Sequence, residues 1–179
     1  NVRIMLNLNA SSLTEREIIG MISLNKDTKW ISVDASKIEK RLMTFPIIER
    51  ATVNKRFPDK LFVEVIERKP VAVSFANIEG NVVPLEIDKE GVVFRIGWNE
   101  KVSLLTIVSG LNFQNPNVGM KINYKLLSLF SRLDAISKTN PILLSGISEI
   151  KIREKKFGDY DLVMYPIHTR VKVFTPKDF

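Results

Sequence analysis

Hydrophobic and polar residues alternate most regularly between residues 45 and 72. Val53 lies in a first apolar segment, and Leu61, Val63 and Val65 recur at every second position of the next one. A period of two places these four side chains on one face of a sheet. A turn containing Pro58 separates the segments, and proline has no N–H to donate to a strand ladder. The pattern predicts a hairpin with strands over 47–55 and 61–68.

The residues before this hairpin predict one strand and two helices. Residues 2–8 alternate as a strand, and Ser12 stands three residues before Glu15, the spacing of a capping box. A helix is therefore expected from Ser12 to about Ile22. Asp34 predicts the N-cap of a second helix that Pro46 closes, because the residue before a proline resists the helical conformation. The expected order over residues 1–69 is β-α-α-β-β.

A different pattern begins at Pro70. Short apolar runs predict several strands, and the turn from Asp88 to Gly91 joins two of them into a hairpin. The segment from Tyr124 to Lys138 carries a helical apolar stripe. No Gly/Ser linker separates the two halves, so we expect a stiff junction at Lys69-Pro70. The strands expected in this half are 71–75, 82–87, 92–96 and 104–108, followed by an antiparallel meander of 147–153, 160–165 and 169–174.

Composition narrows the class of protein. The chain has 179 residues, no cysteine, one histidine and a net charge of +7. Residues 1–69 carry 13 basic and 9 acidic residues, and residues 70–179 carry 14 and 11, so the charge is spread evenly. A nucleic-acid binder concentrates its positive charge on one face or arm, which disfavours that class. No apolar run is long enough to span a membrane, and we expect this sequence to be a fragment of a longer protein.

Candidate catalytic or metal-binding residues are few. His168 lacks a second histidine or a nucleophile motif and is expected in a turn. Asp159 and Asp161 lie near Glu154, but their surroundings have hairpin composition and lack the spacing of a calcium loop. No phosphate-binding glycine loop occurs. These features disfavour an enzyme and predict no cofactor or metal site.

One predicted strand has a basic face. Lys151, Arg153 and Lys155 alternate with Ile150 and Ile152. The row, which Arg170 and Lys172 extend in the same pattern, is either a solvated face or a surface for anionic lipid headgroups, cell-wall polymer or an acidic partner.

One set of residues forms a recognisable signature: Phe45, Pro46, Ile48, Ala51, Val53, Lys55, Pro58, Leu61, Val63, Val65, Glu67, Arg68, Pro70, Ala72, Asp88 and Gly91. With this signature the chain resembles the extracytoplasmic part of the bacterial cell-division proteins of the FtsQ/DivIB family. In the second half, the hairpin from Leu85 to Phe94 and the segment from Leu105 to Gly110 also resemble the family, although Thr106 stands where proline is usual and Phe57 where tryptophan is frequent.

The resemblance implies an α+β protein with a POTRA domain at residues 1–69 and a mixed, mainly antiparallel β domain with one or two helices at 70–179. It implies a non-enzymatic scaffold of the divisome that binds an FtsB–FtsL pair. It also implies an upstream helix in the cytoplasmic membrane, with this fragment on the extracytoplasmic side at the division site. In the family a further helix and a last strand usually follow, so whether the β domain continues beyond residue 179 stays open. The alternative is a POTRA module of an outer-membrane assembly or secretion system, which tandem β-α-α-β-β repeats would favour.

A scaffold rich in short strands is expected to bind partners by strand addition. The expected edge is the last strand, Thr169–Phe174, because no later segment of this sequence covers it. Arg170 and Lys172 would guard it against self-pairing, while Val171 and Val173 would pack inward. The residues of this expected edge are Thr169, Arg170, Val171, Lys172, Val173 and Phe174.

Overall fold

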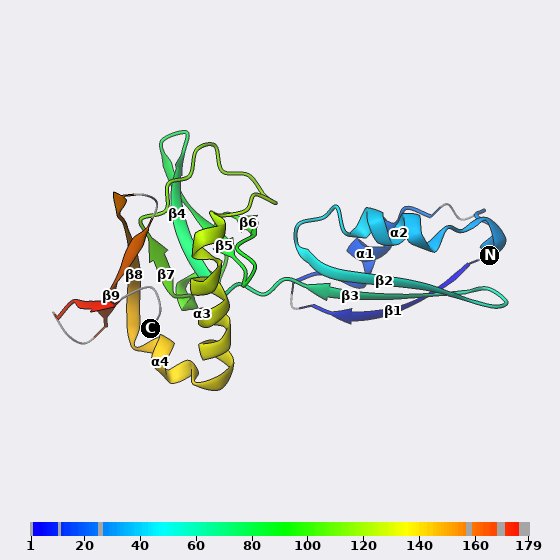
Figure 1. Cartoon of the computed structure of the whole chain (residues 1–179). Coiled ribbons are helices and arrows are strands. Elements are labelled where there is room, and N and C mark those ends of the chain that lie inside the picture. The colour runs from blue at the N-terminus through cyan, green and yellow to red at the C-terminus, as the bar shows by residue number, and fades with distance from the viewer. Residues whose placement is uncertain (1, 11, 25–26, 157–158, 168–170, 176–179) are drawn as a thin grey trace. The chain divides into compact units, whose positions relative to one another are not determined.

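The computed structural model describes residues 2–10, 12–24, 27–156, 159–167 and 171–175. The chain divides into two compact units, residues 1–68 and residues 69–179. Each unit combines helices with a β-sheet, so the α+β class expected from the sequence is confirmed (Figure 1).

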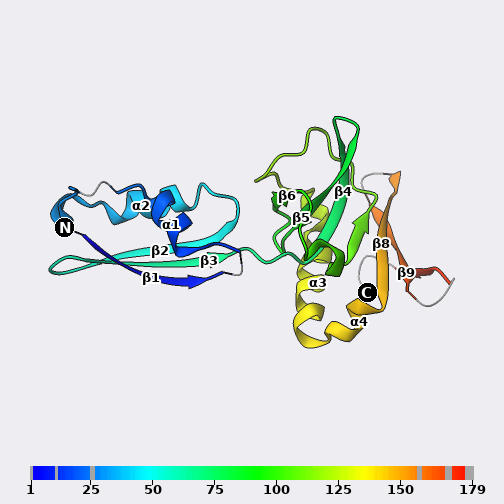
Figure 2. The same cartoon turned by 180° about the vertical axis from the view of Figure 1, so that it is seen from behind.

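The first unit has the predicted β-α-α-β-β order. Its three-stranded sheet has the order β1-β3-β2, in which β1 runs parallel to β3 and β2 runs antiparallel to it. Both helices cover one face of this sheet (Figures 1 and 2). The elements are β1 (Arg3–Asn9), α1 (Glu15–Ile22), the short 3-10 helix η1 (Trp30–Ser32), α2 (Ala35–Leu42), β2 (Ile48–Arg56) and β3 (Lys60–Glu67).

The core of the first unit follows the predicted alternation. Val53, Leu61, Val63 and Val65 are buried in one cluster with side chains of both helices, among them Ile18 and Leu42. A shift of one residue would turn all four sheet side chains toward solvent, so the burial pattern fixes the register of β2 and β3.

The helix boundaries confirm one predicted cap and correct another. Asp34 accepts a hydrogen bond from the Lys37 amide, as expected for the N-cap of α2. The predicted Ser12–Glu15 capping box is wrong, since α1 begins at Glu15 behind a capping box of Thr14 and Glu17. The helix α2 ends at Leu42, so a turn separates its end from Pro46 and the proline does not terminate it.

In its described residues, the second unit contains a seven-stranded sheet with one helix-covered face (Figure 1). Its strand order is β10-β9-β8-β7-β4-β5-β6, with parallel pairing at β4–β7 and β7–β8 and antiparallel pairing elsewhere. The long helix α3 packs on the sheet (Figures 1 and 2) and buries Leu129, Phe130 and Leu133 in the core of this unit.

Several elements of the second unit differ from the predicted ones. The strand expected at 104–108 is shorter and begins later, behind a 3-10 turn, and the helix α4 was not predicted. The elements are β4 (Ala72–Ile78), β5 (Asn81–Ile87), β6 (Val93–Ile96), η2 (Val102–Leu104), β7 (Ile107–Ser109), η3 (Tyr124–Leu126), α3 (Leu127–Thr139), α4 (Pro141–Ser145), β8 (Ile147–Glu154), β9 (Tyr160–Pro166) and β10 (Val173–Thr175).

Candidate partner-binding strand edges

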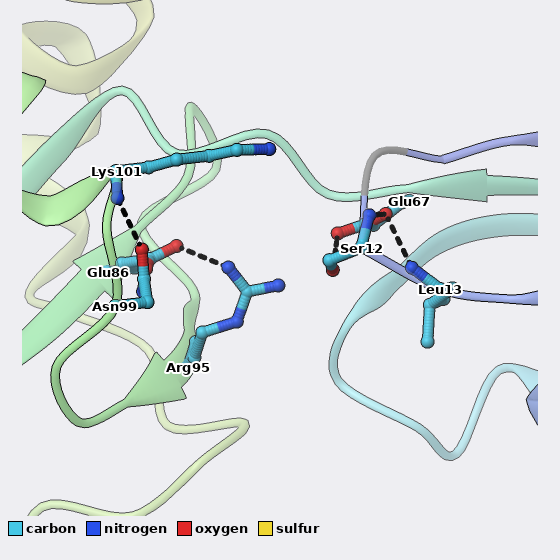
Figure 3. Close-up of polar contacts among 7 residues, drawn as sticks. All are labelled: Ser12, Leu13, Glu67, Glu86, Arg95, Asn99 and Lys101. Carbon is cyan, nitrogen blue, oxygen red and sulfur yellow. Dashed lines mark hydrogen bonds and ion pairs between the residues drawn. The ribbon is translucent and has the colours of Figure 1, made fainter.

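Glu67, the acidic residue of the Glu-Arg signature, is a buried carboxylate at the end of β3. Its side chain accepts hydrogen bonds from the Ser12 amide at 2.9 Å and the Leu13 amide at 3.3 Å, and from the Ser12 hydroxyl (Figure 3). Only 3% of Glu67 is exposed, so these three donors replace the water that a carboxylate needs. Glu67 therefore fixes the loop before α1 to the C-terminal end of β3.

Arg68, the basic residue of the signature, binds the segment before β2. Its Nε donates to the Pro46 carbonyl at 3.0 Å, and its backbone N–H donates to the Ile47 carbonyl at 2.8 Å. Glu67 and Arg68 thus attach two segments, both distant in sequence, to the end of β3. These contacts give the Glu-Arg pair a structural role.

The turn from Asp88 to Gly91 is closed by its own aspartate. One carboxylate oxygen of the buried Asp88 accepts from the amides of Glu90 at 3.0 Å and Val92 at 2.8 Å. Gly91 has a φ of 71°, and an added Cβ would lie 2.5 Å from Cγ1 of Ile122. Both the backbone conformation and the available space therefore require glycine.

Glu86 is a buried carboxylate that the sequence did not single out. Its Oε2 accepts from Nη1 of Arg95 at 3.0 Å, and its Oε1 accepts from the side chain of Asn99 (Figure 3). The position of Glu86 between Leu85 and Ile87 on an apolar strand was the available signal, because a buried carboxylate requires a partner. The contact holds the segment after β6 against the sheet.

An uncharged hollow of about 470 Å³ lies in the second unit. Apolar residues and the hydroxyl-bearing Ser103, Thr106 and Ser148 contribute to its lining. None of the lining residues that the structure describes has an ionisable side chain, so they offer no carboxylate, imidazole or amine for general acid–base chemistry.

The two edges of the seven-stranded sheet differ. At the β6 edge, the Val93 amide donates to the Met120 carbonyl at 2.9 Å, and the Gly119 amide donates to the Val93 carbonyl at 2.7 Å. The segment around Met120 therefore pairs with the first residue of β6. At the other edge, β10 pairs with β9 and no described segment pairs with its outer side. Among the described residues, β10 is the open edge of this sheet.

The last strand is shorter and more exposed than predicted. Val171 and Lys172 precede β10, and Thr169, Arg170 and His168 lie outside the described residues. The expectation that Val171 and Val173 pack inward is wrong, because they are 67% and 40% exposed. Phe174 is 63% exposed and lies opposite Val163 of β9. The open edge thus offers backbone groups flanked by exposed apolar side chains.

Comparison with known proteins identifies the first unit. The protein-family model for the POTRA domain of FtsQ type matches residues 8–68. The cell division protein FtsQ of Koribacter versatilis is 34% identical over 65% of this chain and 33% of its own length. FtsQ of Bartonella bacilliformis is 29% identical over 68% of this chain and 37% of its own length. DivIB of Bacillus subtilis is 29% identical over 49% of this chain and 36% of its own length.

The chain is a relative of the FtsQ and DivIB cell division proteins. It spans about a third of the length of these three relatives. The FtsQ-type POTRA match falls within the first unit and begins near the end of β1.

The basic strand of this FtsQ/DivIB relative has the predicted alternation. Ile150 and Ile152 are buried in the core while Lys151 and Arg153 are exposed. Nζ of Lys155 forms an ion pair with Asp161 at 2.6 Å, so one cation of the row is neutralised locally. Within the described part of the chain, no group of three acidic or histidine side chains is placed to hold a metal ion, and no helix is long and apolar enough to cross a membrane.

Proposed function

We propose that this chain is the extracytoplasmic part of a division-site membrane protein that acts as a non-enzymatic scaffold. The observation that carries the proposal is the FtsQ-type POTRA domain, in a chain whose relatives are named cell division proteins. In this proposal the protein is anchored in the cytoplasmic membrane by a segment upstream of residue 1. A secretion or assembly module is less well supported, because the second unit does not repeat the POTRA topology.

The proposed binding site is the outer edge of β10. An extended segment of an FtsB- or FtsL-like membrane protein would add to the sheet as an eighth strand, with its backbone paired to Val173–Thr175. Three features support this choice: Val93 of the opposite edge strand is already paired, no described segment pairs with the outer side of β10, and Phe174 offers an exposed apolar contact. The expected residues Thr169–Phe174 include the first part of β10 and the segment before it.

The test is binding of the chain to the extracytoplasmic segments of FtsB- and FtsL-like proteins from the same organism, measured by calorimetry. Phe174→Pro removes a backbone donor from β10, and Phe174→Ala removes only the side chain. Proline should abolish binding, whereas alanine should weaken it while the edge remains available. Thermal melting should show that the POTRA unit stays folded in both variants. Full binding by a folded Phe174→Pro variant would refute the β10 site.

A further inference from the structure

The POTRA sheet also has two edges, and one of them is occupied by its own helix layer. At β2, the Val53 amide donates to Oε2 of Glu39 on α2 at 3.1 Å. Nζ of Lys55 on the same strand donates to the Val33 carbonyl at 2.7 Å. An incoming strand would have to displace both contacts, so β2 is a closed edge.

The other edge is β1. The hydrogen bond of its first residue shows which backbone groups of the strand face β3 and which face outward. The Arg3 amide donates to the Asp59 carbonyl at 2.8 Å, so the backbone groups of Arg3 face β3. In an uninterrupted strand the direction alternates, which turns the N–H and C=O of Ile4, Leu6 and Leu8 away from the sheet. Among the described residues, none pairs with this outer side of β1.

The β1 edge lacks the devices that usually protect an edge strand. It is seven residues long, its register with β3 contains no bulge, and its sequence RIMLNLN contains no proline. Its one charged residue, Arg3, stands at the end and pairs with Asp59 at 3.0 Å. An exposed edge of this kind presents a row of unpaired backbone groups that can pair with another strand, and charge, proline and bulges are the usual devices against it. An edge with these properties is suited to receive a strand.

We propose that the occupant is β1 of a second copy of this chain, paired antiparallel about Leu6. The sequence of β1 is self-complementary in this register. Leu6 lies opposite its own copy, Ile4 lies opposite Leu8, and Met5 lies opposite Asn7. Arg3 then faces Asn9, so no like charges oppose each other. A strand of another protein would need a matching pattern, whereas the second copy already has it.

The same register uses every outward backbone group of the edge. Each of Ile4, Leu6 and Leu8 would form a hydrogen-bonded pair with its opposite residue, and each pair exchanges two bonds. Their side chains are half-buried against the POTRA core, so the two cores would continue into each other. The two-fold axis produces one six-stranded sheet with all helices on the same face, an isologous dimer.

The experiment changes the charge at the two exposed positions that face each other. Met5 is 47% exposed and Asn7 is also exposed, so substitutions there leave the core intact. Asn7→Lys combined with Met5→Lys places like charges opposite each other twice. Asn7→Lys combined with Met5→Glu places opposite charges there and differs only in the sign at residue 5.

Sedimentation equilibrium from micromolar to millimolar concentration measures the dimer. Wild type should dimerise reversibly, and the dissociation constants of the two double variants should differ roughly tenfold or more, with the like-charged variant weaker. A wild-type chain that is monomeric at millimolar concentration would overturn the proposal. Equal dimerisation of the two variants would also overturn it, because the register would then be wrong.

Amide exchange adds a residue-level readout. In the wild-type dimer the amides of Ile4, Leu6 and Leu8 should be protected, and they should exchange faster in the like-charged variant. The Arg3 amide, which bonds to Asp59, should behave alike in both. The Phe174→Pro variant should dimerise normally, which separates this edge from the proposed β10 site. A dimer lost in Phe174→Pro would place the contact at β10 and refute the β1 interface.

Discussion

Val63→Asp should unfold the POTRA unit. Val63 is 1% exposed at the centre of β3, between Leu6 of β1 and Val53 of β2. Loss of its apolar burial costs about 2 kcal/mol. A carboxylate in this apolar cluster would in addition lack hydrogen-bond partners, a penalty of several kcal/mol. At roughly 0.05–0.15 kcal/mol per residue, a unit of this size has a total stability of ~3–10 kcal/mol.

Fluorescence of Trp30 provides the assay, because this residue lies in the POTRA unit and contacts the β2–β3 hairpin. Its Nε1 donates to the Lys60 carbonyl at 3.1 Å. A Trp98→Phe background removes the signal of the second unit, and urea unfolding then reports on the POTRA unit alone. The matched control is Asn54→Asp, which places a carboxylate on the exposed face of the neighbouring strand. Val63→Asp with an unfolding midpoint equal to that of Asn54→Asp would refute the assigned register.

Two further predictions concern local structure. Gly91→Ala should destabilise the second unit by about 1 kcal/mol or more, because the residue has a φ of 71° and the added Cβ would clash with Ile122; a denaturation midpoint equal to that of wild type would contradict this reading. The pKa of Glu17 is lowered first by the hydrogen bond from the Thr14 side chain and then by the bond from the Thr14 backbone. Ionised Glu17 therefore stabilises the folded POTRA unit above the unfolded-state pKa of this carboxyl group, and the stabilisation is lost as pH falls through the lower folded-state pKa. Glu17→Gln should accordingly make acid unfolding of the POTRA unit, measured by circular dichroism, less dependent on pH.

The POTRA topology could be predicted because its signals are local. The alternation of Val63 and Val65 and the Asp34 cap each act within a few residues, and the structure confirms them. The start of α1 could not be predicted in the same way, because Ser12–Glu15 and Thr14–Glu17 both have capping-box spacing. The contact of Ser12 with Glu67 decides between them, and that contact joins residues 55 positions apart.

The second unit was predicted less completely because its arrangement depends on contacts between distant segments. The insertion of β7 between β4 and β8 uses two parallel pairings, and no turn motif specifies their partners. The exposure of Val171 and Val173 shows the same limit. Alternation predicts which side chains share a face of a strand, but burial requires another layer against that face. The sequence pattern alone does not say whether such a layer exists.

The residues that carry the family resemblance are mostly structural, and this explains why they locate the fold better than the binding site. Glu67, Arg68, Asp88 and Gly91 each satisfy a backbone or steric requirement that only a few residue types can meet. Strand addition makes weaker demands on sequence, because the partner pairs with backbone groups that every residue except proline carries. The edges β1 and β10 are therefore identified from their surroundings in the structure. The deciding observations are whether a described segment pairs with the edge, whether the edge carries charged residues, and whether its side chains are exposed.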